Sequence, residues 1–132
     1  MMKKLSQCVL LCLIILVSAC ATNKPNPLQN LSGTYIGQVV SVINIPIKTE
    51  FSVNDKGVRS GQYVMTERDG TQVSGTLDEF KQEGPYTLLV SWHDKYGNGK
   101  LRMLFSQQQR SFKGFWGHHV DSTLMRWDGV KE

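Results

Sequence analysis

The sequence predicts an all-β fold, a small antiparallel up-and-down barrel of about eight strands. First, groups of turn-forming residues recur at short intervals and separate runs that are rich in strand-forming residues. Second, apolar side chains alternate along the later runs, as at Leu101, Met103 and Phe105, which gives each strand one apolar face. Third, the connections are short, whereas a parallel crossover needs about a dozen residues. Neighbouring strands are therefore expected to be antiparallel.

The turn signals divide the chain into its expected strands. The strongest turns are Asn54-Asp55-Lys56-Gly57, Arg68-Asp69-Gly70, Glu83-Gly84-Pro85 and Lys95-Tyr96-Gly97-Asn98-Gly99, the last of which is read as a Gly-Asn-Gly hairpin turn. The expected strands are residues 33–42, 47–53, 62–66, 71–77, 86–93, 101–106, 112–117 and 122–127. Closure into a barrel removes exposed strand edges, so it is favoured over the alternative, a two-sheet β-sandwich.

Residues 1–19 have the order of features of an export signal. Lys3 and Lys4 supply positive charge, an apolar run follows from residue 8 to residue 17, and small residues end the segment. The run is shorter than the roughly 20 apolar residues that a membrane-spanning helix needs. Residues 1–19 are therefore expected to be a signal peptide.

The end of this segment, Val17-Ser18-Ala19-Cys20, resembles the lipobox of bacterial lipoproteins. The resemblance implies cleavage between Ala19 and Cys20 and attachment of lipid to the Cys20 sulfur. Two or three acyl chains make such an attachment effectively permanent. The expected organisation is a lipoprotein signal peptide at 1–19, a lipidated tether at 20–30 and a small β-barrel domain at 31–132.

The residue after Cys20 indicates to which bacterial membrane the protein is expected to be attached. Ala21 stands where many Gram-negative lipoproteins have an aspartate that retains them in the inner membrane. The resemblance therefore implies the bacterial cell envelope, with a lipid anchor in the outer membrane and the domain at its periplasmic face. The tether, residues 21–30, is rich in proline and asparagine and is expected to stay exposed and unpacked.

Removal of 19 residues from 132 leaves a mature chain of 113 residues with one cysteine, so no internal disulfide is expected. The mature chain has 13 basic and 11 acidic side chains, a net charge of +2, without a basic cluster. This near balance gives no support for nucleic acid as a partner. The membrane, through the anchor, is the expected contact.

A short phrase with a central glycine recurs where strands begin. Its copies are Ser32-Gly33-Thr34-Tyr35, Ser60-Gly61-Gln62-Tyr63, Ser74-Gly75-Thr76-Leu77 and Lys113-Gly114-Phe115-Trp116. A missing side chain lets the strands of a closing sheet bend or approach closely. The phrase resembles the calycin group of small barrels, the lipocalins, avidins and fatty-acid-binding proteins, in which Gly-x-aromatic opens the first strand. Tyr35 stands where lipocalins have tryptophan, and the resemblance assigns no binding residue.

The residues that could carry chemistry do not form a catalytic or metal-binding pattern. Adjacent residues of a strand point to opposite faces, so His118 and His119 are not expected to share a metal ion. The segment from Asp94 to Gly99 lacks the ligand alternation of a calcium loop. The chain has no Gly-x-Ser-x-Gly elbow and no phosphate-binding loop. The sequence therefore predicts a protein that is not an enzyme and needs no cofactor or metal.

The aromatic residues are the remaining candidates for a site. They are Tyr35, Tyr63, Trp92, Phe105, Phe112, Trp116 and Trp127. One interpretation is that they fill the core, as in many small eight-stranded barrels. The other is a lined pocket in which Tyr35, Trp92 and Trp116 bind a ligand.

Two functions follow from these features. The first is non-enzymatic binding of an envelope protein partner or a small apolar ligand. The alternative is inhibition of a periplasmic or host enzyme such as lysozyme through an exposed loop at residues 95–100, as in small β-barrel lipoproteins that resemble lysozyme inhibitors. That family usually has a disulfide, which this chain lacks.

Replacing Cys20 by alanine removes the only sulfur to which lipid can be attached in the mature chain. We expect Cys20→Ala to leave an uncut precursor or a soluble form, which envelope fractionation and labelling with radioactive palmitate would detect. A mature, acylated membrane protein recovered from this variant would contradict the lipid anchor.

Overall fold

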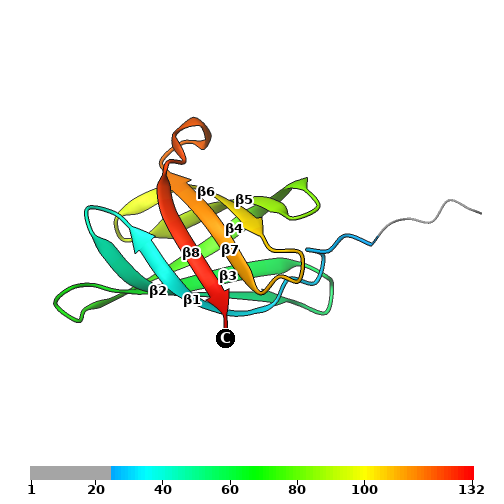
Figure 1. Ribbon diagram of the computed structural model, residues 1–132, viewed down its shortest axis with the longest axis horizontal. Coiled ribbons are helices and arrows are strands. Elements are labelled where there is room, and N and C mark those ends of the chain that lie inside the picture. Colours follow the sequence, from blue (N-terminus) through cyan, green and yellow to red (C-terminus); the bar gives the residue numbers. More distant parts are fainter. Residues whose placement is uncertain (1–24) are drawn as a thin grey trace, which may run out of the picture.

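The computed structural model describes residues 25–132, which form one closed antiparallel barrel of eight strands (Figure 1). The strands are β1 (Gly33–Val40), β2 (Asn44–Val53), β3 (Arg59–Thr66), β4 (Gln72–Gly84), β5 (Thr87–Asp94), β6 (Gly97–Phe105), β7 (Ser111–Gly117) and β8 (Met125–Lys131). A short 3₁₀ turn, η1 (Val120–Ser122), lies between β7 and β8. The predicted signal peptide and the predicted lipidation site at Cys20 lie outside the described residues.

Each strand pairs with its neighbours in the sequence, and β8 pairs with β1 to complete the ring. In this last pairing Gly37 lies opposite Gly129, and Val39 lies opposite Trp127. The predicted all-β, up-and-down barrel is confirmed, and the alternative of a two-sheet sandwich is wrong. The backbone N–H and C=O groups at the two edges of the sheet, which would otherwise be exposed, therefore form hydrogen bonds with each other.

All eight expected strands exist, but several bounds differ from the prediction. β4 continues to Gly84 instead of ending at residue 77, because the register shifts between Asp78 and Lys81 and Glu79 takes a positive φ of 52°. Such a bulge lets a strand bend without ending. β8 begins at Met125, after a loop that includes η1.

The turn between β5 and β6 is also displaced from its predicted position. Asp94 pairs with Gly97, so the two residues of the turn are Lys95 and Tyr96. The predicted Gly-Asn-Gly turn is wrong, since Gly97, Asn98 and Gly99 already belong to β6. The change brings the Tyr96 ring to the tip of the hairpin.

The antiparallel order gives the barrel two different ends. We call one the mouth end, where the loops 41–43, 67–71, 95–96 and 118–124 lie, and the other the plugged end. The plugged end holds the N-terminal segment and the loops 54–58, 85–86 and 106–110. In Figure 1 the β1–β2 and β3–β4 loops point to the left, whereas the N-terminal segment approaches from the right.

The plugged end is closed by residues that the sequence assigned to the tether and the start of the domain. Leu28 is 0% exposed, and Leu31 is buried with it in the core. Arg59 Nη1 donates to the Leu28 carbonyl at 3.1 Å, and Asn26 Oδ1 accepts from the Leu28 N–H at 3.0 Å. The prediction that residues 21–30 stay unpacked is therefore wrong for Leu28, because the open end of an apolar barrel requires cover.

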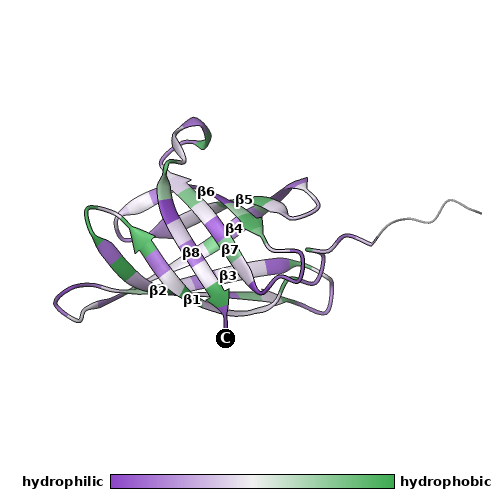
Figure 2. Cartoon of the chain, in the orientation of Figure 1, coloured by the Kyte–Doolittle hydropathy of each residue, from purple (hydrophilic) through white to green (hydrophobic). Residues whose placement is uncertain are grey.

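Aromatic rings fill the plugged half of the interior. The Tyr35 ring packs edge-on against Phe51, Phe105 and Phe112, with centroids 5.8, 5.9 and 5.4 Å away. The Tyr35 hydroxyl donates to the Gln109 carbonyl at 2.6 Å. In Figure 2 hydrophobic (green) and hydrophilic (purple) residues are interspersed along the strands, and most of the loops are hydrophilic. The core interpretation of the aromatic residues holds for this half.

Glycines make room for the large side chains. A Cβ added at Gly75 would lie 2.1 Å from Tyr63 Cζ. A Cβ added at Gly129 would lie 2.6 Å from Phe112 Cε1 and 2.8 Å from Tyr35 Cβ. Of the recurring glycines, Gly75 makes room for a ring and Gly114 allows the backbone of β8 to approach closely, and close approach is the use that the sequence predicted.

Replacing Leu28 by alanine tests whether the plug is part of the folded domain. We expect Leu28→Ala, in the chain from Ala21 to Glu132, to lower the free energy of unfolding by about 3 kcal/mol, because it leaves a cavity in the core. Urea denaturation measures the change. The matched control is Leu124→Ala, at a leucine that is 79% exposed, with an effect below about 0.5 kcal/mol. Equal stability of the two variants would contradict the plug.

Candidate functional site

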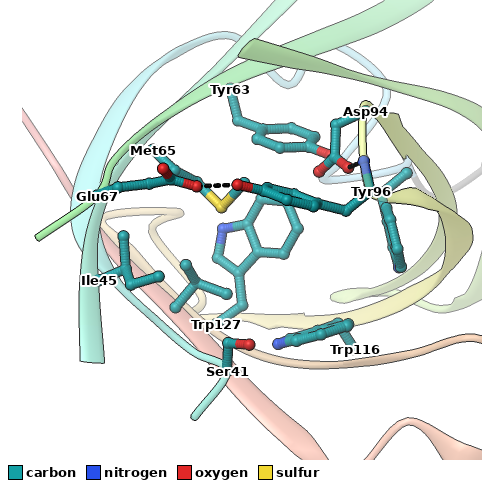
Figure 3. A pocket seen from close by; sticks show the side chains of 11 residues that line it. Ser41, Ile45, Tyr63, Met65, Glu67, Asp94, Tyr96, Trp116 and Trp127 are labelled. Atoms are coloured by element: carbon teal, nitrogen blue, oxygen red, sulfur yellow. Dashed lines mark hydrogen bonds between the residues drawn. The ribbon is translucent and has the colours of Figure 1, made fainter. Parts of the chain in front are cut away.

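The mouth end of the barrel contains a pocket with a volume of about 120 Å³. Its lining is mainly apolar and aromatic, with two carboxylates (Figure 3). The lining residues are Val39, Ser41, Ile45, Tyr63, Met65, Glu67, Trp92, Asp94, Tyr96, Trp116 and Trp127. The barrel is therefore filled in its plugged half and hollow near its mouth.

Strand periodicity places these side chains together. Tyr63, Met65 and Glu67 occupy every second position along β3 and just beyond its end, so all three point inward. Trp92 and Asp94 repeat the pattern on β5. The lining thus consists of the last inward positions of several strands before the mouth.

The indole nitrogens of all three lining tryptophans donate to acceptors within the protein. Trp92 Nε1 donates to the Gly117 carbonyl at 3.1 Å, and Trp116 Nε1 donates to the Val40 carbonyl at 2.9 Å. Trp127 Nε1 donates to Thr49 Oγ1 at 3.0 Å. Because these donors are occupied, the tryptophans offer carbon surface to the pocket.

The rings pack on one another in two pairs. The Trp92 and Trp116 centroids are 5.5 Å apart, and the Tyr63 and Trp127 centroids are 4.7 Å apart, both edge-to-face. Edge-to-face pairs add favourable energy beyond the burial of their area. The contacts between these rings therefore stabilise the positions of the lining side chains.

Both carboxylates accept hydrogen bonds from neutral donors. Asp94 Oδ2 accepts from the Tyr63 hydroxyl, and Asp94 Oδ1 accepts from the Tyr96 N–H, each at 2.8 Å. The Tyr96 hydroxyl donates to Glu67 Oε1. This last bond joins the β5–β6 turn to the end of β3, and Figure 3 shows Tyr96 extended toward Glu67.

The surroundings keep the two phenols protonated. Burial raises the pKa of Tyr63, and its hydrogen bond to Asp94 and the charge of that carboxylate raise it further. The hydrogen bond to Glu67 is the main cause of the raised pKa of Tyr96, which is 59% exposed. Both hydroxyls therefore remain donors to the carboxylates across the physiological range.

The structure separates the three residues that the sequence proposed as ligand-binding. Trp92 and Trp116 both line the pocket, with Trp92 buried and Trp116 half-buried. Tyr35 is fully buried among phenylalanines at the plugged end and does not line the pocket. The structure thus places Tyr35 in the core rather than in the candidate site.

Several lining residues are absent from the predicted ligand-binding set of Tyr35, Trp92 and Trp116. They include Tyr63 and Trp127, which the sequence marks only as aromatic residues, and the carboxylates Glu67 and Asp94. The alternation Tyr63, Met65, Glu67 was the available signal, since it continues the inward face of a strand past its end.

The histidines do not line the pocket and contact residues outside a metal-binding cluster. His93 Nε2 lies 2.9 Å from Asp78 Oδ1, on the exposed surface. The His118 ring lies against Trp92, with centroids 5.7 Å apart. Within residues 25–132, no group of three or more His, Cys, Asp or Glu side chains could hold a metal ion.

Comparison of the chain with protein-family models, with curated proteins and with solved structures found no match. Among the described residues, no helix has the length and apolar character needed to cross a membrane.

The raised pKa of Tyr63 predicts a loss of stability in alkali. An unfolded tyrosine loses its proton near pH 10, whereas folded Tyr63 keeps it, so the unfolded state binds fewer protons above about pH 10. The contribution is fully present below about pH 10 and declines above it, by up to about 1.4 kcal/mol per pH unit. Tyr63→Phe removes the ionisable hydroxyl and with it this pH-dependent contribution to the free energy of unfolding.

We expect the free energy of unfolding to fall less steeply between about pH 10 and pH 11 in Tyr63→Phe than in the wild type. Urea denaturation at several pH values measures both slopes. Tyr35, whose pKa burial also raises, is unchanged in both proteins and so contributes equally. Identical slopes would contradict the proposed state of Tyr63.

Proposed function

We propose that this protein is a non-enzymatic binding protein of the bacterial envelope, whose barrel binds a small apolar group in the pocket at its mouth. The observation that carries the proposal is a pocket lined by three tryptophans whose indole N–H groups are all bonded within the protein. Pockets with apolar and aromatic linings and a few placed polar groups are typical of ligand sites. The binding free energy of a ligand would come mainly from burial of apolar surface against these rings.

The pocket volume limits what can enter. A volume of about 120 Å³ is somewhat smaller than a cavity of roughly 150 Å³ that binds benzene in an engineered protein. The pocket therefore suits one ring or one branched alkyl group. The remainder of a larger ligand would stay outside the mouth.

The polar groups of the pocket favour binding over catalysis. Asp94 is held by Tyr63 and by the backbone of Tyr96, and Glu67 accepts from the Tyr96 hydroxyl. Both phenols have raised pKa values, so neither is suited to act as a base near neutral pH. These groups serve better to shape the rim than to move protons.

The anchor belongs to the same proposal. Cleavage after Ala19 and lipid on Cys20 would attach the chain to the outer membrane, at its periplasmic face. Because Leu28 is packed on the barrel, the eight steps from Cys20 to Leu28 can span at most about 28 Å. The N-terminal segment meets the plugged end, so the mouth would point away from the membrane.

A second candidate, binding of a protein partner, is favoured by two loops at the mouth. Val42 is 96% exposed in the β1–β2 loop, and Leu124 is 79% exposed in the β7–β8 loop. A protein partner at the mouth would bury these two apolar side chains. Inhibition of an enzyme such as lysozyme is one form of this candidate, and the exposed turn Lys95-Tyr96 is the part of residues 95–100 that it would use.

Native mass spectrometry of the chain from Ala21 to Glu132, purified gently from the periplasm, tests ligand binding. We expect an added mass that denaturation removes. Trp116→Ala is expected to reduce its occupancy about tenfold, because truncating an aromatic anchor in a pocket commonly costs this much. The control is Tyr86→Ala, at a half-buried aromatic residue of the plugged end, with unchanged occupancy. A bare wild-type mass would contradict ligand binding and favour the protein partner.

A further inference from the structure

In the described part of the chain, the two carboxylates of the pocket accept hydrogen bonds from neutral groups only. Glu67 and Asp94 are both half-buried and both line the pocket. Within residues 25–132, neither takes part in a salt bridge, and the donors that they accept from are two phenols and a backbone N–H. A partly buried charge loses hydration that neutral donors replace only in part. A cation in the pocket would supply the missing charge.

The aromatic rings of the pocket also suit a positive charge. The face of an aromatic ring attracts a cation within about 6 Å of its centroid, and tryptophan does so best. The pocket is lined by three tryptophans and two tyrosines. Its indole N–H groups are already bonded, so an anion or a sugar hydroxyl would find none of these three donors free.

The loops of the mouth end are acidic although the whole chain is basic. Four acidic and two basic side chains lie in the loops 67–71 and 118–124 and in the β5–β6 hairpin at residues 94–97, which includes the strand residues that flank its turn. Their net charge is −2, against +4 for the whole sequence. These residues are Glu67, Asp69, Asp94 and Asp121, and Arg68 and Lys95. The field at the mouth therefore favours cations over anions.

The chain already places one ammonium group on this rim. Lys95 Nζ lies 4.9 Å from the centroid of the Tyr96 ring, whose hydroxyl donates to Glu67. This contact combines the same elements, an aromatic face beside a carboxylate. It also means that the charge of Lys95 opposes an incoming cation.

We propose that the pocket selects an alkylammonium group, such as the trimethylammonium end of choline, over a neutral group of the same shape. This inference rests on the proposed function, since it names the ligand class of the same pocket. The aromatic rings contact the methyl groups, Glu67 and Asp94 supply the opposite charge, and the small volume admits the head of a larger molecule but not its body.

The test compares choline with 3,3-dimethylbutan-1-ol, in which carbon replaces the charged nitrogen. Calorimetry and tryptophan fluorescence are followed with the chain from Ala21 to Glu132, which contains all eight strands and the plug. We expect choline to bind at least tenfold more tightly at low ionic strength, and the ratio to narrow as salt is added.

Three variants assign the effect to charge at the pocket. Glu67→Gln keeps an acceptor for Tyr96 and is expected to weaken choline binding about fivefold while leaving the neutral analogue unchanged. Lys95→Met keeps the length of the side chain and is expected to strengthen choline binding about twofold. Asp55→Asn, at an exposed residue of the plugged end, is the matched control and leaves both affinities unchanged.

The outcomes separate this inference from the proposed function. Equal binding of the two compounds would overturn the preference for a cation and leave the apolar pocket standing. Choline binding that Trp116→Ala does not weaken would place the cation outside the pocket and overturn the inference. Binding of neither compound, together with a bare wild-type mass, would overturn both.

Discussion

The pairing of β8 with β1 sets the interior volume that every inward side chain must share. A barrel of eight strands has an interior just wide enough for side chains to fill. Glycine at a neighbouring position makes room for large rings, as at Gly75 beside Tyr63 and at Gly129 beside Phe112. Closure of the barrel, the size of the interior rings and the positions of the glycines therefore depend on one another. A change in any of them forces the backbone or the rings to move.

The two ends of the barrel meet this constraint differently. At the plugged end the chain supplies Leu28 and Leu31 as cover, and the rings around Tyr35 pack against one another. At the mouth the cover is a hydrogen bond between Tyr96 and Glu67, and a hollow remains beneath it. The candidate site results from this asymmetry, and it lies at the end opposite the proposed anchor.

Much of the fold could be predicted because strand periodicity and turn chemistry are local. The eight strands and their antiparallel order followed from short connections and from alternation such as Leu101, Met103 and Phe105. The errors occur where distant contacts override local preference. β4 continues beyond its predicted end because the bulge at Glu79 bends the strand without ending it. Leu28 belongs to the expected exposed tether, yet its side chain is buried in the core.

The sequence by itself determined that the chain forms a closing all-β sheet, and alternation identified many of the side chains that face inward. It also supplied the lipobox resemblance, on which the anchor proposal depends. Only the tertiary structure decided which inward residues meet. Tyr35 and Trp116 are both inward aromatic residues, yet one lies in a filled core and the other in a pocket. The stagger between strands and the cover at each end set this difference, and both arise from contacts between residues far apart in the sequence.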